Sequence, residues 1–371
     1  MTNNQKENRE EKSKWFIKSI FIWFGNKIFN YNYQIANKKI TKINENIFNE
    51  AFNSLSSKIG NYTILLQKLI PVFNITLEEF RDNEKTGKMK RSFDKDSDIE
   101  CMGGVSKKFI LEKVADNFII NNFEFFKNTT DTIKNNLSGF QSVYSNSIKT
   151  ETPLVCGLGA THVLETALTL HHIWGVPYIP ASSLKGVCRQ AAFWNLAEEK
   201  NTVENELNSF QNKFYGDLVV GDEKILTYQL LFGAQDFKGL LLFIDAYPEC
   251  ENNQKIFKLD VMNPHYSKYY GDDEGRTPPA DWENPTPIFF LTVKEGVEFR
   301  FVVLFDNWRW EKIKGREVIV NNKKVNIDTN VSSEINKILS NNNFFEKILK
   351  QALTFYGVGS KTRLGYGNFE V

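Results

Sequence analysis

The chain has 371 residues, of which 41% are hydrophobic and 14% aromatic, so it can form one elaborated domain or two small ones. Its formal net charge of +1 provides no overall field that would steer an anion, and any nucleic-acid binding has to come from a local basic surface. The four cysteines form no CxxC pair and no signal peptide is recognisable, so we expect reduced thiols in a cytoplasmic protein.

Residues 1–150 predict a variable, largely helical part packed on a following core. The apolar run Trp15–Phe24 is too short to span a bilayer and contains Lys18, so we predict a buried or partner-facing helix. Residues 41–55 carry apolar side chains at helical spacing. The basic stretch Glu84–Lys95 is typical of a solvated loop, and an arm that grips phosphates is the alternative.

From residue 151 onward the expected order is strand, helix, strand, strand, helix, strand. The elements are a strand over 162–173, a helix capped by Ser182 or Ser183, strands over 239–247 and 297–306, a helix over 343–357 and a closing strand over 365–371. This is the βαββαβ arrangement of a ferredoxin-like (RRM-like) α+β fold. Long insertions separate the elements, notably around 248–287.

The C-terminal sequence FYGVGSKTRLGYGNFEV raises the possibility of a phosphate site. It is not a nucleotide-binding P-loop, because Ser360 stands before Lys361 and because the predicted order is helix, loop, strand. Glycines such as Gly357 and Gly359 leave the backbone accessible, and Lys361 and Arg363 add positive charge. Composition alone leaves two options open, an anion-binding loop and an ordinary glycine-rich connection.

The helix near residue 185 carries two further candidates. Lys185 and Arg189 are four residues apart and project from one face near the positive end of the helix, where they hold phosphates or are simply solvated cations. Ser182 and Lys185 also match the SxxK motif of serine acyl-transfer enzymes, but the companion motifs are missing or out of order, and we reject this chemistry.

The histidines do not predict a metal site. His171 and His172 are adjacent and would face opposite sides of a strand, and His162 and His265 lack partners at usable spacing. We therefore expect no metal and no cofactor. A histidine base for metal-free RNA cleavage stays open as an alternative.

Several ordered motifs resemble the repeat-associated mysterious protein (RAMP) superfamily. They are GLGATHVLETALTLHHIWGVPYIPASSLKGVCR at 157–189, DVMNPHYSKYY at 260–270, PPADWENPTPIFFLTV at 278–293 and the terminal glycine-rich loop. Within that superfamily they are most similar to subunits of the type III-B CRISPR–Cas effector, the Cmr complex. The resemblance covers residues 155–310 and 344–371.

The resemblance implies a ferredoxin-like RAMP core over 151–371 and a role as a non-catalytic RNA-binding and assembly subunit of the interference complex. Such a subunit caps the backbone filament near the 3′ side of the CRISPR RNA and contacts the guide–target duplex. The implied partners are CRISPR RNA, target RNA and the backbone RAMP subunit, subunit one and the small subunit, with no membrane. A metal-independent endoribonuclease and a purely structural cap without RNA contact are the alternatives.

On this resemblance we expect a set of residues to contact RNA, namely Ser183, Lys185, Arg189, Gly357, Gly359, Lys361, Arg363 and Tyr366. Tyr366 would stack on a base or ribose, and a core aromatic is its alternative. Met262–Tyr270, with aromatics beside His265 and Lys268, is a further candidate contact surface for RNA or protein.

Overall fold

The computed structural model forms two compact units, residues 1–110 and 111–371, each with its own sheet. The structure describes residues 14–24, 27–29, 33–34, 73–80, 107–117, 123–160, 166–250, 254–280, 282 and 284–371. The helix predicted over 41–55 and the basic stretch Glu84–Lys95 lie outside these residues. Within this part of the chain, no helix is long and apolar enough to cross a membrane.

The described strands of the first unit form an antiparallel sheet. Its strands are β1 (Lys14–Phe24), β2 (Lys27–Phe29), β3 (Tyr33–Gln34) and β4 (Phe73–Phe80), with β1 paired to each of the others. The helix predicted for Trp15–Phe24 is therefore wrong. The run is rich in isoleucine and aromatic residues, which favour strands, and with only Lys18 and Ser19 polar it shows no clear helical period.

The second unit is built on an antiparallel sheet in the order β13-β5-β10-β6, and β7 also pairs with β10. Its strands are β5 (Phe140–Thr150), β6 (Leu241–Phe243), β7 (Tyr247–Pro248), β10 (Glu298–Asp306) and β13 (Phe369–Glu370). The β10–β5 pairing runs from Glu298 opposite Lys149 to Asp306 opposite Phe140. This confirms the strand predicted over 297–306, and β13 confirms the closing strand.

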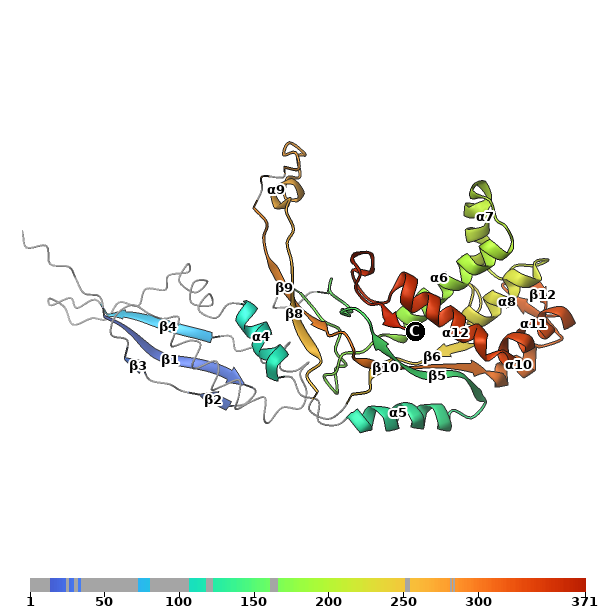
Figure 1. Cartoon of the computed structure of the whole chain (residues 1–371), viewed down its shortest axis with the longest axis horizontal. Coiled ribbons are helices and arrows are strands. Elements are labelled where there is room, and N and C mark those ends of the chain that lie inside the picture. The colour runs from blue at the N-terminus through green and yellow to red at the C-terminus, as the bar shows by residue number, and fades with distance from the viewer. Residues whose placement is uncertain are drawn as a thin grey trace, which may run out of the picture. The chain divides into compact units, whose positions relative to one another are not determined.

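The central strand β10 is buried on both of its faces. Val303 and Leu304 are both fully buried, and successive side chains of a strand point to opposite faces of a sheet. Helices α6 (Ala181–Glu199) and α12 (Asn342–Gln351) lie on one side of the sheet and α5 (Phe123–Asn136) on the other (Figure 1). The predicted α+β class and both predicted core helices are confirmed.

The strand predicted over 162–173 is wrong for the part that the structure describes. Residues 166–173 form no strand, and Leu170 makes only an isolated bridge to Pro177. The place of the first core strand belongs to β5, which starts before the predicted core boundary at residue 151. Its sequence FQSVYSNSIKT is largely polar, so no apolar pattern announces it.

The cap predicted for the first core helix is also wrong. Helix α6 begins at Ala181 with Pro180 in the N-cap position, and no side chain of Ser182 or Ser183 caps it. Instead, the Ala181 N–H donates to Asp245 Oδ1 at 2.6 Å. A carboxylate just beyond β6 thus satisfies the first turn and ties the helix to the sheet.

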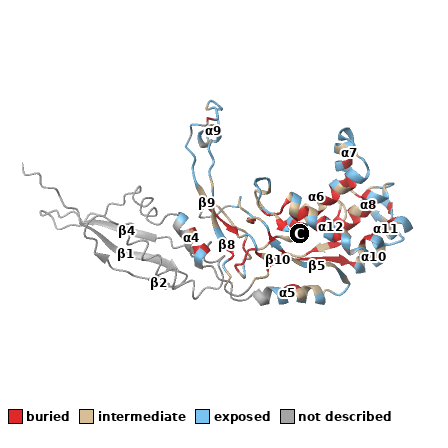
Figure 2. Cartoon of the chain, in the orientation of Figure 1, coloured by how far each residue is buried: buried red, intermediate tan, exposed pale blue. Residues whose placement is uncertain are grey.

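Two further groups of elements extend from the core (Figure 1). One end holds α7 (Glu204–Tyr215), α8 (Glu223–Phe232), α10 (Asn307–Ile313), β11 (Glu317–Val320), β12 (Lys323–Asn326) and α11 (Thr329–Ser340). The predicted insertion forms a projecting hairpin of β8 (Phe257–Met262), α9 (Ser267–Tyr270) and β9 (Ile288–Val293). Figure 2 shows the buried residues gathered in the sheet and its covering helices, and exposed residues at the hairpin tip.

An arginine on β10 fastens α5 to the sheet. Arg300 donates from Nη2 to Asp131 Oδ1 at 2.8 Å and from Nη1 to Glu249 Oε1 at 3.1 Å, and its side chain is 17% exposed. We expect Arg300→Ala to lower the free energy of unfolding by about 2–3 kcal/mol, because it leaves two half-buried carboxylates unpaired. Urea denaturation measures this difference.

The matched control is Arg276→Ala, which removes an arginine whose ion pair with Glu274 is largely exposed. Exposed pairs contribute little, so we expect a change below about 0.5 kcal/mol. Equal effects of the two substitutions would contradict a fastening role for Arg300.

Candidate nucleic-acid interface

The terminal loop is held firmly against the segment that follows β5. The Ser360 N–H donates to the Val155 carbonyl at 2.7 Å, and the Gly367 N–H donates to the Pro153 carbonyl at 2.9 Å. The Val358 N–H closes the loop on itself by donating to the Gly367 carbonyl at 2.9 Å. The loop is therefore a fixed part of the core's surface.

Packing within the chain explains most of the loop's glycines. A Cβ on Gly359 would lie 2.5 Å from the Val155 carbonyl oxygen, and one on Gly367 would lie 2.0 Å from the Val358 oxygen. Both have positive φ, as does Gly357, which follows the helix in the predicted C′ position. Close backbone packing is thus sufficient to account for these glycines, and RNA contact at Gly357 and Gly359 stays a prediction.

Two cations stand on this rigid loop. Lys361 adopts the left-handed conformation with φ 61°, which is uncommon for a residue with a side chain, and it is half-buried. Arg363 is exposed in the short 3₁₀ helix η2 (Thr362–Leu364). Among the described residues, no carboxylate forms a salt bridge with either side chain.

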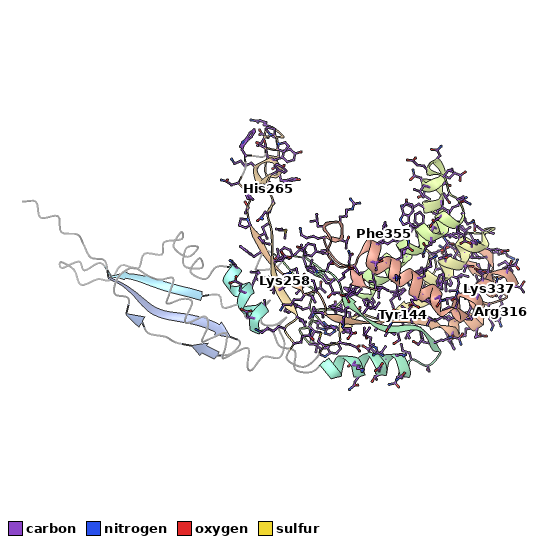
Figure 3. All side chains as sticks on the ribbon, viewed as in Figure 1. Tyr144, Lys258, His265, Arg316, Lys337 and Phe355 are labelled. Carbon is purple, nitrogen blue, oxygen red and sulfur yellow. The ribbon has the colours of Figure 1, made fainter. Side chains whose placement is uncertain are left out.

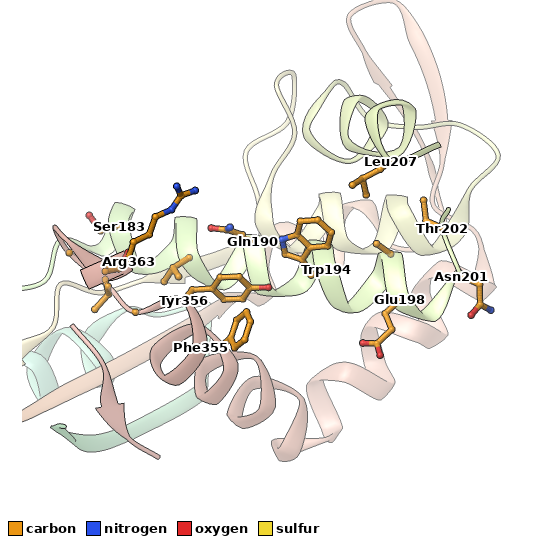
Figure 4. Close-up of a pocket in the computed structure, with 16 residues that line it drawn as sticks. Ser183, Gln190, Trp194, Glu198, Asn201, Thr202, Leu207, Phe355, Tyr356 and Arg363 are labelled. Atoms are coloured by element: carbon orange, nitrogen blue, oxygen red, sulfur yellow. The ribbon is translucent and has the colours of Figure 1, made fainter. Parts of the chain in front are cut away.

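A groove of about 1250 Å³ runs beside the loop, between α6 and the π-helical turn η1 (Ala352–Tyr356) that ends α12 (Figure 4). Its lining comprises Ser183, Val187, Gln190, Trp194, Ala197, Glu198, Asn201, Thr202, Leu207, Phe355, Tyr356, Gly357, Val358, Gly359, Thr362 and Arg363. Four of the residues expected to contact RNA therefore meet here, namely Ser183, Gly357, Gly359 and Arg363.

The groove also exposes aromatic side chains that the sequence did not single out. Phe355 is 77% exposed and Trp194 is 40% exposed, and Figure 4 shows both beside Tyr356. Helical spacing could have predicted Trp194 as a neighbour of Ser183. The two are eleven residues apart on the same helix, which places both on one face. Exposed rings beside hydroxyl, amide and guanidinium groups suit stacking on bases with polar contacts to a backbone.

Lys185 and Arg189 lie on nearly the opposite side of α6 from the groove. Lys185 donates from Nζ to the Leu241 carbonyl of β6 at 3.1 Å. Arg189 donates from Nη2 to the Phe214 carbonyl at 3.2 Å, and its guanidinium lies over the Tyr215 ring. The predicted pair does share one face, but that face is separate from the loop and its groove.

Tyr366 is engaged within the chain. Its hydroxyl donates to Asp260 Oδ2 on β8 at 2.8 Å, and its ring lies 6.2 Å from that of Phe290 on β9. Burial, together with this carboxylate, raises the pKa of the Tyr366 hydroxyl to about 12. The tyrosine thus links the terminal loop to the base of the hairpin.

The hairpin tip carries the candidate surface Met262–Tyr270. His265, Lys268, Tyr269 and Tyr270 are all exposed, and Figure 3 shows His265 far out on the hairpin. The tip is therefore accessible to a macromolecular partner.

The described histidines form no metal site. His171 stacks on Trp174 at 4.1 Å and on His172 at 4.9 Å, and burial lowers the pKa of His171. Over the described residues no group of His, Cys, Asp and Glu is arranged to hold a metal ion. His162 lies outside those residues.

Comparison with known proteins identifies the class of fold. Residues 147–370 match the model of the RAMP superfamily, and the chain belongs to this superfamily. It is 31% identical over 278 residues to the CRISPR system Cmr subunit Cmr6 of Pyrococcus furiosus. The aligned region covers 66% of this chain and 72% of that protein. The Cmr6 subunit of Saccharolobus solfataricus is 25% identical over 270 residues, covering 72% and 76%.

Among solved structures, a chain of the type III-B Cmr-beta complex bound to cognate target RNA matches with a TM-score of 0.48 at 19% identity. The match covers 90% of this chain and 91% of that one. On the basis of the two sequence relatives, the chain resembles Cmr6 of the type III-B CRISPR system.

The shifted pKa of Lys185 makes the free energy of unfolding of the protein depend on pH. Burial first, and then the neighbouring cations beginning with Arg189, lower the pKa of Lys185 from 10.5 to about 8. Between these values the unfolded chain binds more protons than the folded chain, so stability rises with pH through this interval. Below pH 8 the half-buried Lys185 side chain is charged in the folded protein, and its partial loss of hydration costs stability.

We compare the melting temperature of Lys185→Met with that of wild type at the same pH. We expect this difference to be more positive at pH 7 than at pH 10. At pH 10 the folded-state lysine is neutral and most of the cost that methionine removes has disappeared, because the unfolded-state pKa of 10.5 is nearly reached. Lys347→Met, at an exposed position of α12, is the control and should show no such trend. A pH-independent effect at Lys185 would exclude a shifted lysine.

Proposed function

We propose that this chain is a non-catalytic RNA-binding and assembly subunit of a type III-B CRISPR interference complex. The observation that carries the proposal is the pair of cations on the rigid loop, Lys361 and Arg363, without carboxylate partners among the described residues and next to a groove with exposed aromatic rings. Membership of the RAMP superfamily and the likeness to Cmr6 supply the setting. The loop's cations and groove bind RNA through its phosphates and bases.

The core is best understood as ferredoxin-like. In chain order it reads β5, α6, β6, β10, α12, β13, and in space the strands stand in the order β13-β5-β10-β6. This supports the βαββαβ arrangement with the hairpin β8–β9 inserted before β10. On this core, Ser183, Gly357, Gly359 and Arg363 line the groove, and Lys361 stands beside it.

Within the complex, we infer a position at the end of the backbone filament near the 3′ side of the CRISPR RNA, in contact with the guide–target duplex. The partners are the CRISPR RNA, the target RNA, the backbone RAMP subunit, subunit one and the small subunit. The exposed hairpin tip, Met262–Tyr270, offers a surface for one of these partners. Ser183, Lys185, Arg189 and Tyr366 stay in the proposed set of RNA contacts, Tyr366 through its ring because its hydroxyl is bonded to Asp260.

The double variant Lys361→Ala/Arg363→Ala tests the loop. For a short single-stranded RNA we expect the slope of log affinity against log salt to fall by roughly 1.4, since each lost phosphate contact removes about 0.7. Fluorescence anisotropy titrations at several salt concentrations measure the slope. An unchanged slope would remove the loop from the interface.

The matched control is Lys347→Ala/Lys350→Ala, which removes two exposed lysines of α12 that do not line the groove. Its slope should equal that of wild type.

RNA recovered from the wild-type titration in EDTA should be intact. Site-specific cutting that His171→Ala abolishes would contradict the non-catalytic proposal.

Phe355 tests the aromatic part of the groove. Phe355→Leu keeps an apolar side chain of similar size but loses the ring, so we expect about tenfold weaker binding of single-stranded RNA from lost stacking. The salt slope should not change, because no charge is removed. Phe355→Tyr keeps the ring and should bind as wild type does. If Phe355→Leu also binds as wild type, bases do not stack here.

A further inference from the structure

Four cations gather on the side of α6 that faces away from the groove. Lys185 and Arg189 come from α6, Lys238 precedes β6, and Arg309 comes from α10. We call these four residues the cation cluster. Each of the other three lowers the pKa of Lys185, which places all of them within electrostatic reach of its ammonium group.

Neutral groups hold these cations in place. Arg309 donates from Nη2 to the Lys238 carbonyl at 2.7 Å and from Nη1 to the Gly239 carbonyl at 3.3 Å, and its guanidinium lies over the Phe237 ring at 5.2 Å. Lys185 is held by the Leu241 carbonyl. Carbonyls and rings orient a cation without cancelling its formal charge.

The two remaining members differ in how much they are constrained. Arg189 is fixed by the Phe214 carbonyl and the Tyr215 ring, and its Nε is buried without a hydrogen-bond partner. The Lys238 side chain is exposed. The cluster therefore combines three positioned cations with one that is free to adapt.

Little negative charge offsets the cluster. Among the described residues, the one carboxylate in a salt bridge with any of the four is Asp306, whose Oδ2 lies 3.8 Å from Arg309 Nη1. Three of the four cations therefore have no carboxylate partner among the described residues, and the nearby Asp245 carboxylate accepts from the Ala181 N–H instead. Mutual repulsion among these cations is unfavourable in the free protein, and an anion would relieve it.

We propose that the cation cluster binds phosphates of an RNA backbone and forms a second anchor, separate from the terminal loop. The inference rests on the proposed function and extends it to a second face of α6. A nucleic-acid strand carries a negative charge at every nucleotide, so successive phosphates can neutralise several members of the cluster together. Ser183 and Lys185 both lie near the start of α6, so a strand that leaves the groove over this end reaches the cluster.

Lys238 provides the cleanest test, because no hydrogen bond or salt bridge of its side chain supports the described fold. With the full-length protein and an unstructured single-stranded RNA of about 12 nucleotides, we expect Lys238→Ala to lower the salt slope by about 0.7. Lys238→Glu should weaken binding about tenfold at low salt, since it places a repelling charge beside the phosphate. Lys347→Ala and Lys347→Glu, on α12, are the matched controls and should bind as wild type does.

A second variant tests the cluster by its titration. The groups facing Lys185 are Arg189, Lys238 and Arg309, and Lys185 itself has a pKa of about 8. Wild-type affinity should therefore fall between pH 7 and pH 9, whereas Lys185→Arg keeps its charge and should hold its affinity over that range. If wild type and Lys185→Arg share one pH profile, Lys185 does not contact the phosphate.

The outcomes separate this inference from the proposed function. If Lys361→Ala/Arg363→Ala weakens RNA binding while Lys238→Glu does not, the second anchor is overturned and the proposed function stands. If neither variant weakens binding, both fail. If Lys238→Glu leaves RNA affinity intact but prevents association with the protein subunits of the complex, the cluster binds an acidic protein surface and the inference is wrong.

Discussion

The structure depends above all on the pairing of β10 with β5 at the centre of the sheet. Strand β10 is buried on both faces, so burial of its side chains brings helices to both sides of the sheet. The same strand carries β6 on its other edge, and β5 carries β13. The terminal loop ends in β13, and Lys185 of α6 bonds to Leu241 of β6, so both proposed RNA surfaces are positioned from this one pair of strands.

The parts of the fold that the sequence predicted correctly are those with a clear apolar period. Strand β10 alternates through Phe299 and Phe301, and α12 has its apolar residues at helical spacing, so burial and local pattern agree. Strand β5 was missed because its stability comes from backbone pairing with β10 and β13, which a polar sequence does not reveal. Trp15–Phe24 was assigned to the wrong class because its apolar residues are broken only by Lys18 and Ser19, which is too little polar pattern to reveal a period.

The site shows the same division between local and tertiary information. The sequence identified the loop cations and the Lys185–Arg189 pair, since charge and i, i+4 spacing are local properties. The orientation of α6 about its own axis, which depends on its packing against the sheet, determines the surface on which each residue lies. In this orientation Lys185 and Arg189 lie on a different face from Ser183. Trp194 and Phe355 were not predicted, because the groove that they line forms only where α6 and η1 pack together.

The glycines give the loop a different physical role from the one that composition suggests. A loop whose N–H groups are bonded to Val155 and Pro153 loses little further entropy when a ligand binds. Lys361, held in a left-handed conformation, is part of that fixed backbone, so the cost of presenting its charge is met during folding. Close packing of glycine therefore holds Lys361 and Arg363 in place at the surface that we propose for RNA, in a chain with almost no net charge.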